Sequence, residues 1–361
     1  MNEQKKFSFK NLRVQLISND LGVDLGTANV LVYVDKKGIQ VREPSVVAMD
    51  KNTGHVLEVG AAARNMLGRT PGNLVAMKPL TGGVISDHEM TVRLLQAMFR
   101  RSSNSSLFTP KPRLVISVPS GITEVEERTV INAAIEAGAR RVYLIEEPLA
   151  AALGAGLDIS GPSGHMVVDI GAGTTDVAIL SMNGVAVSNS SKVAGDTFDD
   201  LIVRYMRRQH SLNIGQTMAE DIKMQIGSVH HQGKDIFMEV TGYDISTGKP
   251  RNHTVSSSEI FKVLQRPARQ IADLILTVLE ETTPELVGDV YKNGITLTGG
   301  MAQLAGMAQL VTEATGIQCV VADDPASCVV LGCGKSLAWI NHMQEGPVNL
   351  ARRRLMNKNI Q

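Results

Sequence analysis

Two short segments, roughly half a chain apart, place an aspartate, a glycine and a hydroxyl residue at the end of an apolar run. They are residues 23–29 (VDLGTAN) and residues 168–176 (VDIGAGTTD). Glycine lets the backbone turn tightly, and successive N–H groups in such a turn form a concavity that binds anions. An aspartate beside the turn would repel a phosphate unless a divalent cation lay between them. The two segments therefore predict a pair of hairpins that hold a triphosphate and its magnesium ion from both sides.

A single strand that ends in Asp-x-Gly is equally well explained by an ordinary β-turn. Two copies, both after strands that look buried, favour phosphate binding and indicate a duplicated α/β unit with a cleft between its halves. Neither copy is a Walker P-loop, because neither turn contains the pattern Gly-x-x-x-x-Gly-Lys-Ser/Thr. Neither fits the Rossmann fingerprint, because a second strand, not a helix, is expected directly after the glycines.

Three further stretches place carboxylates or glycines that could contact a ligand at the ends of expected strands or the starts of expected helices. Glu146 and Glu147 follow a strand, where a carboxylate can orient water at a γ-phosphate or simply favour a helix N-terminus. Gly195 and Asp196 precede a helix and suit either a ribose contact or a plain N-cap by Asp196. Residues 297–300 (LTGG) run from a strand into glycines, against which a purine ring could lie.

The elements that must position these groups alternate along the chain, which predicts an α/β fold with helices on the sheet faces. Periodicity and turn signals predict strands at residues 21–25, 30–34, 45–49, 114–118, 142–145, 165–170 and 294–298, with a β-rich insert at 235–255. Helices are expected at residues 87–101, 147–155, 198–209, 216–227, 257–281, 304–315 and 325–341. A further helix is expected to begin at Thr123, where Glu126, three residues later, would complete a capping box. The Gly-, Ser- and Pro-rich residues 158–164 are the best candidate for a domain boundary.

Composition limits the class of protein. The 361 residues exceed one ordinary core, so two or more domains are expected, and a formal net charge of zero gives no overall field for nucleic acid. Three cysteines, Cys319, Cys328 and Cys333, are too few for a disulfide scaffold and suggest apolar roles in a reducing cytosol. We expect neither a signal peptide nor a transmembrane helix, because no apolar run is long enough.

The motifs together resemble the actin-like ATPase superfamily and, within it, the MreB family of bacterial cell-shape proteins. The resemblance spans about residues 20–340 and is carried by residues 24–29, 43–48 (EPSVVA), 67–72 (LGRTPG), 145–148 (IEEP), 168–176, 194–196 (AGD) and 297–300. It implies two duplicated RNase H-like α/β halves around a nucleotide cleft, divided into four subdomains. The implied boundaries are residues 1–47, 82–161 and 331–361 for subdomain IA, 48–81 for IB, 162–197 and 262–330 for IIA, and 198–261 for IIB.

The resemblance also implies roles for individual residues around ATP and Mg²⁺. Asp24 and Asp169 would hold the metal through water, and Glu147 and Thr174 would be catalytic by orienting the attacking water. The implied nucleotide-binding residues are Gly26, Thr27, Ala28, Asn29, Gly171, Ala172, Gly173, Thr174, Gly195, Asp196, Glu220, Lys223, Gly299, Gly300 and Met301. Taken alone, Glu220 and Lys223 are also explained by a salt bridge on the surface of one helix. Three residues depart from the family pattern: Val30 stands where Thr is usual, and Ala172 and Met301 stand where Gly is common.

Members of this family polymerise into filaments that lie on the inner face of the cytoplasmic membrane and guide cell-wall synthesis in rod-shaped cells. The implied partners are other copies of the chain, the membrane and the membrane proteins of cell-wall elongation, and not nucleic acid. Leu107 and Phe108, between a Ser/Asn run and two prolines, are expected to dock in the bilayer, assisted by the basic, amphipathic residues 5–17. The alternative is a small-molecule kinase of the same superfamily, whereas a heat-shock chaperone would need a long region after the last motif.

Overall fold

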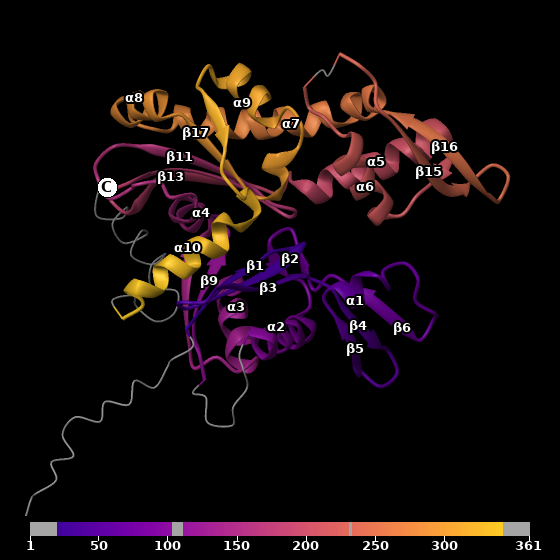
Figure 1. Ribbon diagram of the computed structural model, residues 1–361, viewed down its shortest axis with the longest axis horizontal. Coiled ribbons are helices and arrows are strands. Elements are labelled where there is room, and N and C mark those ends of the chain that lie inside the picture. The colour runs from indigo at the N-terminus through magenta and orange to yellow at the C-terminus, as the bar shows by residue number, and fades with distance from the viewer. Residues whose placement is uncertain (1–19, 103–110, 231–232, 342–361) are drawn as a thin grey trace, which may run out of the picture.

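Two five-stranded sheets with the same topology form the centre of the molecule (Figure 1). The computed structural model describes residues 20–102, 111–230 and 233–341. The first sheet has the order β10-β9-β1-β2-β3, from β1 (Leu21–Leu25), β2 (Asn29–Val34), β3 (Gly38–Pro44), β9 (Arg113–Val118) and β10 (Arg141–Glu146). The second has the order β13-β12-β11-β17-β18, from β11 (His165–Ile170), β12 (Thr175–Ser181), β13 (Gly184–Ser191), β17 (Ile295–Thr298) and β18 (Cys319–Val321).

Strand direction repeats as well as strand order. In each sheet three consecutive strands form an antiparallel meander, and two later strands join in parallel beside the first of the three. The duplication predicted from the two aspartate-glycine segments is therefore present in the topology. It places both segments at the same point of their sheets, in the connection between the first and second strands.

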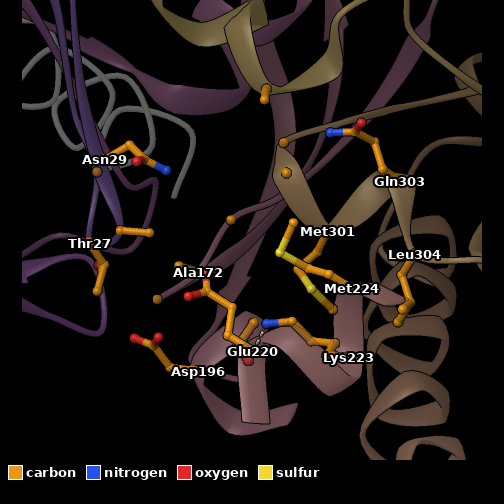
Figure 2. A pocket seen from close by; sticks show the side chains of 18 of the residues that line it. Thr27, Asn29, Ala172, Asp196, Glu220, Lys223, Met224, Met301, Gln303 and Leu304 are labelled. Carbon is orange, nitrogen blue, oxygen red and sulfur yellow. Dashed lines mark hydrogen bonds between the residues drawn. The ribbon is translucent and has the colours of Figure 1, made fainter. Parts of the chain in front are cut away.

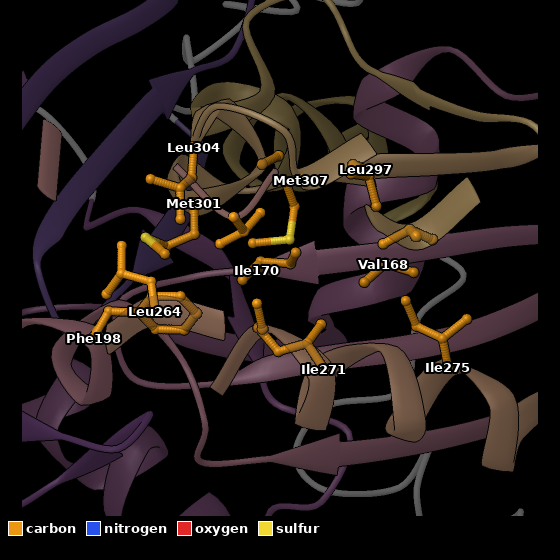
Figure 3. Packing of buried hydrophobic residues seen from close by; sticks show 14 of the residues in the cluster. Val168, Ile170, Phe198, Leu264, Ile271, Ile275, Leu297, Met301, Leu304 and Met307 are labelled. Atoms are coloured by element: carbon orange, nitrogen blue, oxygen red, sulfur yellow. The ribbon is translucent and has the colours of Figure 1, made fainter. Parts of the chain in front are cut away.

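Helices cover both faces of each sheet, which is why the inner strands read as nearly continuous apolar runs. On the first sheet, α2 (His88–Ser102) and α3 (Glu124–Glu136) share one buried cluster with β1, β2 and β9. On the second, the long α7 (Ser257–Glu280) packs Leu264, Ile271 and Ile275 toward Val168 and Ile170 of β11 (Figure 3). Helices α5 (Gly195–His210), α8 (Pro284–Asn293) and α9 (Met307–Thr315) complete this half.

Helices α4 (Glu147–Ala155) and α10 (Cys328–Ser336) lie between the two sheets (Figure 1). Their backbones approach so closely that a Cβ on Gly154 would lie 1.7 Å from the carbonyl oxygen of Cys328. Likewise, a Cβ on Gly332 would lie 1.8 Å from the carbonyl oxygen of Ala150. Only glycine fits at both positions. This helix pair therefore joins the halves at one end, and the connections after β1 and β11 face each other beyond it.

Two smaller sheets extend from the halves toward the same end of the molecule (Figure 1). One has the order β5-β4-β6, from β4 (Val47–Asp50), β5 (Val56–Val59) and β6 (Leu74–Met77), with the short α1 (Ala61–Arg64) beside it. The other has the order β14-β15-β16, from β14 (Leu212–Asn213), β15 (Phe237–Asp244) and β16 (Lys249–Ser256), with α6 (Gln216–Ile226). A two-stranded hairpin, β7 (Leu80–Thr81) and β8 (Val84–Ile85), follows β6.

Several sequence predictions need correction. Strand β3 was missed, because its charged and half-exposed residues hide the alternation that marks a strand. The strand expected at residues 45–49 is β4, which begins two residues later. The helix expected at 325–341 is α10 flanked by the 3₁₀ turns η2 (Pro325–Ser327) and η3 (Leu337–Trp339), and the one expected at 304–315 is α9, preceded by η1 (Gly300–Gln303). Asp196 is not an N-cap, because Ala194 holds that position.

The capping box predicted at Thr123 is confirmed. The Thr123 hydroxyl accepts the N–H of Glu126, and the Glu126 carboxylate accepts the N–H of Thr123 at 2.8 Å. Cys319 lies in β18 and Cys328 and Cys333 lie in α10, all three buried with free thiols. All three belong to buried hydrophobic clusters, which confirms their expected apolar roles.

Candidate functional site

The two expected phosphate loops adopt the same closed turn. The N–H of Gly26 donates to the carbonyl of Asn29 at 3.1 Å, and the N–H of Gly171 donates to the carbonyl of Thr174 at 2.9 Å. Each turn joins the first two strands of its sheet. The segments are therefore repeats in structure as well as in sequence.

Ser45 fixes the first loop through two hydrogen bonds. Its N–H donates to the carbonyl of Ala28 at 2.8 Å, and its hydroxyl donates to the carbonyl of Gly26 at 2.6 Å. Within the described ranges, no hydrogen-bond acceptor is found for the N–H groups of Thr27 and Ala28. The carbonyls of Gly26, Ala28 and Asn29 are thus occupied, and two successive amides remain available for an anion.

The start of α5 holds the second loop in the same way. The N–H groups of Gly195 and Asp196 donate to the carbonyls of Gly171 and Ala172, at 3.1 Å and 2.8 Å. The N–H groups of Ala172 and Gly173 again have no acceptor in the part of the chain that is described. Gly195 and Asp196, expected near a ribose, therefore also buttress the phosphate loop.

The two loops meet through glycines. The N–H of Gly83, in the β7–β8 turn, donates to the hydroxyl of Thr27 at 3.1 Å. A Cβ on Gly173 would lie 2.3 Å from that hydroxyl oxygen and 2.7 Å from the nitrogen of Gly83. Gly83 itself has φ +77°, and a Cβ there would lie 2.6 Å from Cγ2 of Thr174. Glycine at 83 and 173 is what allows both loops to approach one ligand from opposite sides.

An aspartate lies at the start of each loop, and Asp169 is buried whereas Asp24 is partly buried. Burial raises the pKa of Asp24 to about 7, although the hydroxyl of Ser117, 3.5 Å from Oδ1, lowers it. Burial likewise raises the pKa of Asp169 to about 7, against the lowering effect of the Thr298 hydroxyl, which donates to Oδ1 at 2.7 Å. Each aspartate therefore has one oxygen fixed by a neighbour and carries a strong penalty for being charged.

Two further carboxyl groups adjoin these aspartates. Burial first, and then the charges of Asp176, Asp169 and Asp24, raise the pKa of Glu147 well above its ordinary value. Burial raises the pKa of Asp176 to about 6, although the N–H of Ser120 donates to its Oδ1 at 2.9 Å. No Lys or Arg among the described residues forms an ion pair with any of the four carboxyl groups.

Such a set fits a hard cation, which prefers carboxylate oxygens and would offset the charge that burial penalises. Yet in residues 20–102, 111–230 and 233–341, no three His, Cys, Asp or Glu side chains converge closely enough to hold a metal alone. An ion between Asp24 and Asp169 would therefore need further oxygens from water or from a ligand. Coordination through water is what the resemblance implies for these two aspartates.

Lys223 does not pair with Glu220, although both lie on α6. Its ammonium lies 2.8 Å from Oδ1 of Asp199 and donates to the carbonyl of Gly195 at 3.2 Å. Lys223 and Asp199 are both buried. Burial raises the pKa of Asp199 to about 6, although the nearby ammonium of Lys223 lowers it. The alternative, a salt bridge between Glu220 and Lys223 on the surface of one helix, is therefore wrong. Lys223 instead connects α6 to α5 at the wall of the pocket.

Glu220 and Asp196 instead form ion pairs with cations on the other side of the cleft, in the segment that contains α1 and β6. Oε2 of Glu220 accepts from the guanidinium of Arg64 at 2.6 Å, and Oδ1 of Asp196 lies 3.1 Å from the ammonium of Lys78. Arg64 ends α1, and Lys78 directly follows β6. The sequence offered no signal for either cation.

The far end of the pocket is apolar. Gly299, with φ +82°, passes so close to β11 that a Cβ would lie 2.4 Å from the carbonyl oxygen of Ile170, while Gly300 is open. The buried side chain of Met301 lies beside Gly195. Met224 of α6 is 73% exposed, and Figure 2 shows its thioether turned toward that of Met301. Two thioethers and a bare glycine backbone suit the faces of an aromatic ring.

One cavity of about 720 Å³ brings these groups together (Figure 2). It is lined by every residue expected to contact nucleotide or metal: Asp24, Gly26, Thr27, Ala28, Asn29, Glu147, Asp169, Gly171, Ala172, Gly173, Thr174, Gly195, Asp196, Glu220, Lys223, Gly299, Gly300 and Met301. Sequence reasoning missed Arg64, Gly83, Asp199, Met224 and Gln303, which also line it. Of these, only Gly83 carried a signal, as the second residue of a Gly-Gly pair.

The expected membrane residues Leu107 and Phe108, and the N-terminal residues 5–17, lie outside the described residues. In the part of the chain that is described, no helix combines the length and apolar character needed to cross a bilayer.

Comparison with known proteins gives the same assignment as the motifs. The sequence profile of the family described as MreB/Mbl protein matches residues 18–345. The chain belongs to the MreB/Mbl family. The cell shape-determining protein MreB of Escherichia coli K12 is 46% identical over 330 residues, covering 90% of this chain and 95% of that protein. The cell shape-determining protein Mbl of Bacillus subtilis 168 is 46% identical over 322 residues, covering 89% and 96%.

Solved structures confirm the actin-like fold. MreB5 of Spiroplasma citri bound to ADP matches with a TM-score of 0.85 and 39% identity, covering 90% of this chain and 98% of that one. The same protein bound to AMPPNP gives a TM-score of 0.84. The MamK double helical filament, 24% identical with a TM-score of 0.76, shares the fold. Membership of the MreB/Mbl family supports a cytoskeletal role in cell shape and does not support a small-molecule kinase.

Proposed function

We propose that the cavity binds ATP with Mg²⁺ and that the protein is an ATPase whose nucleotide state controls its assembly into filaments. The observation that carries the proposal is the pair of matching loops, whose amides are available, above Asp24 and Asp169. The ADP and AMPPNP complexes of MreB5, which has the same fold, support nucleotide binding by this chain. The cavity extends from the loops to the apolar wall at Met301, which suits phosphates at one end and adenine at the other.

In this proposal each loop holds one phosphate group. Gly26, Thr27, Ala28 and Asn29 bind the β-phosphate, and Gly171, Ala172, Gly173 and Thr174 bind the γ-phosphate. Asp24 and Asp169 would hold Mg²⁺ through water, and the ion would supply positive charge to offset that of the phosphates. Charge on the two aspartates is costly without a cation, so the protein binds the metal and nucleotide together more readily than either alone.

Glu147 and Thr174 are the residues that we assign to hydrolysis. Glu147 is the first residue of α4 and lines the cavity together with Thr174, from the opposite half of the molecule. The Glu147 carboxyl accepts a hydrogen bond from the attacking water and orients it, and the Thr174 hydroxyl fixes the water from the other side. Both side chains are nearly buried, which keeps other water molecules from the reacting phosphate.

The test compares Glu147→Ala with Glu146→Ala. Glu147→Ala is expected to abolish phosphate release and leave ATP affinity unchanged, because the phosphate and metal contacts remain. Glu146, which binds the Ser120 hydroxyl at 3.1 Å and does not line the cavity, provides the neighbouring control. Asp169→Ala should weaken Mg²⁺-dependent binding itself. Unchanged turnover in Glu147→Ala would remove that residue from the role.

We further propose that filaments form with ATP and Mg²⁺, lie on the inner face of the cytoplasmic membrane, and guide the membrane proteins of cell-wall elongation. The contact with lipid is assigned to Leu107 and Phe108, with help from residues 5–17. A single insertion of this size is weak, so polymerisation must multiply it. Electron microscopy of the purified protein with ATP and Mg²⁺ tests assembly directly, and absence of filaments would contradict the proposal.

Liposome co-sedimentation tests the membrane contact. Filaments are expected to pellet with anionic vesicles, whereas monomers remain in solution. Leu107→Ser with Phe108→Ser should release filaments without blocking assembly. Undiminished co-sedimentation by that double variant, with residues 5–17 also deleted, would refute the assignment.

The division into four subdomains with the boundaries given above is also a proposal. The two large sheets would form the cores of IA and IIA, and the two small sheets those of IB and IIB. Under this division the cavity lies where all four meet.

A further inference from the structure

We infer that Arg64 and Lys78 form a cationic gate across the cleft, which slows nucleotide release by pairing with Glu220 and Asp196. The inference rests on the proposed nucleotide site and adds to it two residues from the opposite wall. Arg64 lies 156 residues from its partner and Lys78 lies 118 residues from its own. Both ion pairs therefore join the part of the chain around the β5-β4-β6 sheet to the part around α5 and α6.

The wall that carries Arg64 is tied to the first large sheet. Glu43 at the end of β3 accepts the N–H of Ala61 at 2.8 Å and pairs with Arg101 of α2 at 2.7 Å. Arg101 also donates to the carbonyl of Val59 at 3.2 Å. Helix α1 is therefore fixed at its first residue, and Arg64 extends from its last.

The wall that carries the two carboxylates is tied to the second phosphate loop. Lys223 binds α6 to α5 through Asp199 and the Gly195 carbonyl. The N–H of Asp196 donates to the carbonyl of Ala172 in the loop itself, at 2.8 Å. Because both walls are anchored, the halves cannot separate at this end unless both ion pairs break.

The geometry allows the carboxylates of Glu220 and Asp196 to pair with the two gate residues and to bind a nucleoside at the same time. Arg64 occupies Oε2 of Glu220 and Lys78 occupies Oδ1 of Asp196. For Oε1 of Glu220 and Oδ2 of Asp196, no partner is found within the described ranges. A carboxylate accepts at both oxygens, so these two remain for donors of the nucleoside. Arg64 and Glu220 both line the cavity, so a bound nucleoside lies against the closed gate.

The pairs are strong enough to slow release and weak enough to permit it. The side chains of Arg64 and Glu220 are 40% and 33% exposed, and those of Lys78 and Asp196 are 39% and 37% exposed. Half-exposed pairs change an equilibrium by about twofold to fivefold each. Breaking both should therefore speed nucleotide release by roughly tenfold. Salt should have the same effect on the unaltered protein, because it screens exposed charges.

The experiment measures release of radiolabelled ADP from the full-length monomer with Mg²⁺, chased with unlabelled ADP. The variants are Arg64→Gln, Lys78→Gln and both together, with Arg64→Lys as the conservative change. Arg93→Gln is the matched control, since among the described residues Arg93 forms an ion pair with Glu89 alone, one turn away on α2, and it does not line the cavity. Equilibrium binding of ADP is measured first on every protein.

Each single Gln variant is expected to release ADP about twofold to fivefold faster and the double variant roughly tenfold faster. Arg64→Lys and Arg93→Gln should release it at the original rate. Raising salt to about 0.5 M should speed release from the unaltered protein but not from the double variant. Unchanged rates in the double variant, or equal acceleration by Arg93→Gln, would overturn the gate. Failure of the unaltered protein to bind ADP would instead overturn the proposed nucleotide site.

Discussion

Replacing Asp24 by Asn should stabilise the nucleotide-free protein and weaken its binding of Mg²⁺ and nucleotide. Asp24 lies partly buried beneath the first phosphate loop, and burial raises its pKa from 3.8 to about 7. A raised pKa means that the charged form is disfavoured in the folded state, so folding becomes less favourable as the group ionises. Asn has nearly the same shape and can still accept the hydrogen bond from Ser117, but it never carries the charge.

The magnitude follows from the shift of about three pKa units, which at about 1.36 kcal/mol per unit corresponds to about 4 kcal/mol. Water penetration and relaxation reduce such penalties, so we expect Asp24→Asn to raise the free energy of unfolding by about 1–3 kcal/mol at about pH 8. The sign is set by linkage. The penalty is absent below about pH 4, where Asp24 is neutral in both states, and it grows until the pH passes the folded pKa of about 7.

Urea unfolding of nucleotide-free monomers at several pH values between about 5 and 8 measures this difference. The exposed Asp273 of α7 supplies the control, because Asp273→Asn should change stability little at any pH. Adding Mg²⁺ and ADP should reverse the order, since only the unaltered protein gains the metal contact. A difference in unfolding free energy that is the same at both ends of the pH range would refute the reasoning. So would a loss of stability in Asp24→Asn at the higher pH.

Three further substitutions distinguish residues that affect ATP binding from residues that affect the stability of the fold. Gly173→Ala should weaken ATP binding about tenfold or more in a binding titration, because its Cβ would overlap the first loop, whereas Gly72→Ala, with open space around it, should not. Thr123→Ala should lower the free energy of unfolding by about 1 kcal/mol through loss of the capping box, with ATP affinity unchanged. Lys223→Ala should lower it by about 3–5 kcal/mol, because Asp199 is left buried and unpaired. Adding Asp199→Leu should recover part of that loss, and no recovery would contradict this account.

The sequence alone determined the features that depend on local chemistry. Residues 24–29 and 169–174 form their turns from glycines and strand ends that are adjacent in the chain, so both loops were recognisable. Helix α4 begins and ends at the residues predicted for it, Glu147 and Ala155, because a proline follows its first residue and a left-handed glycine ends it. The predicted lining residues came from motifs of this kind, joined by the family resemblance.

The tertiary structure decided which distant groups meet. Nothing local distinguishes Arg64 from other surface arginines, and its pairing with Glu220 exists only because two anchored walls face each other across the cleft. Lys223 was expected at the nucleotide site and lines the cavity, yet its partner is Asp199 of α5, because burial next to that helix makes an unpaired ammonium costly. Burial likewise raises the pKa values of Asp24, Asp169 and Glu147, and nearby carboxylates raise those of Asp169 and Glu147 further. Local sequence sets turns and caps, whereas long-range packing sets the electrostatics of the cleft.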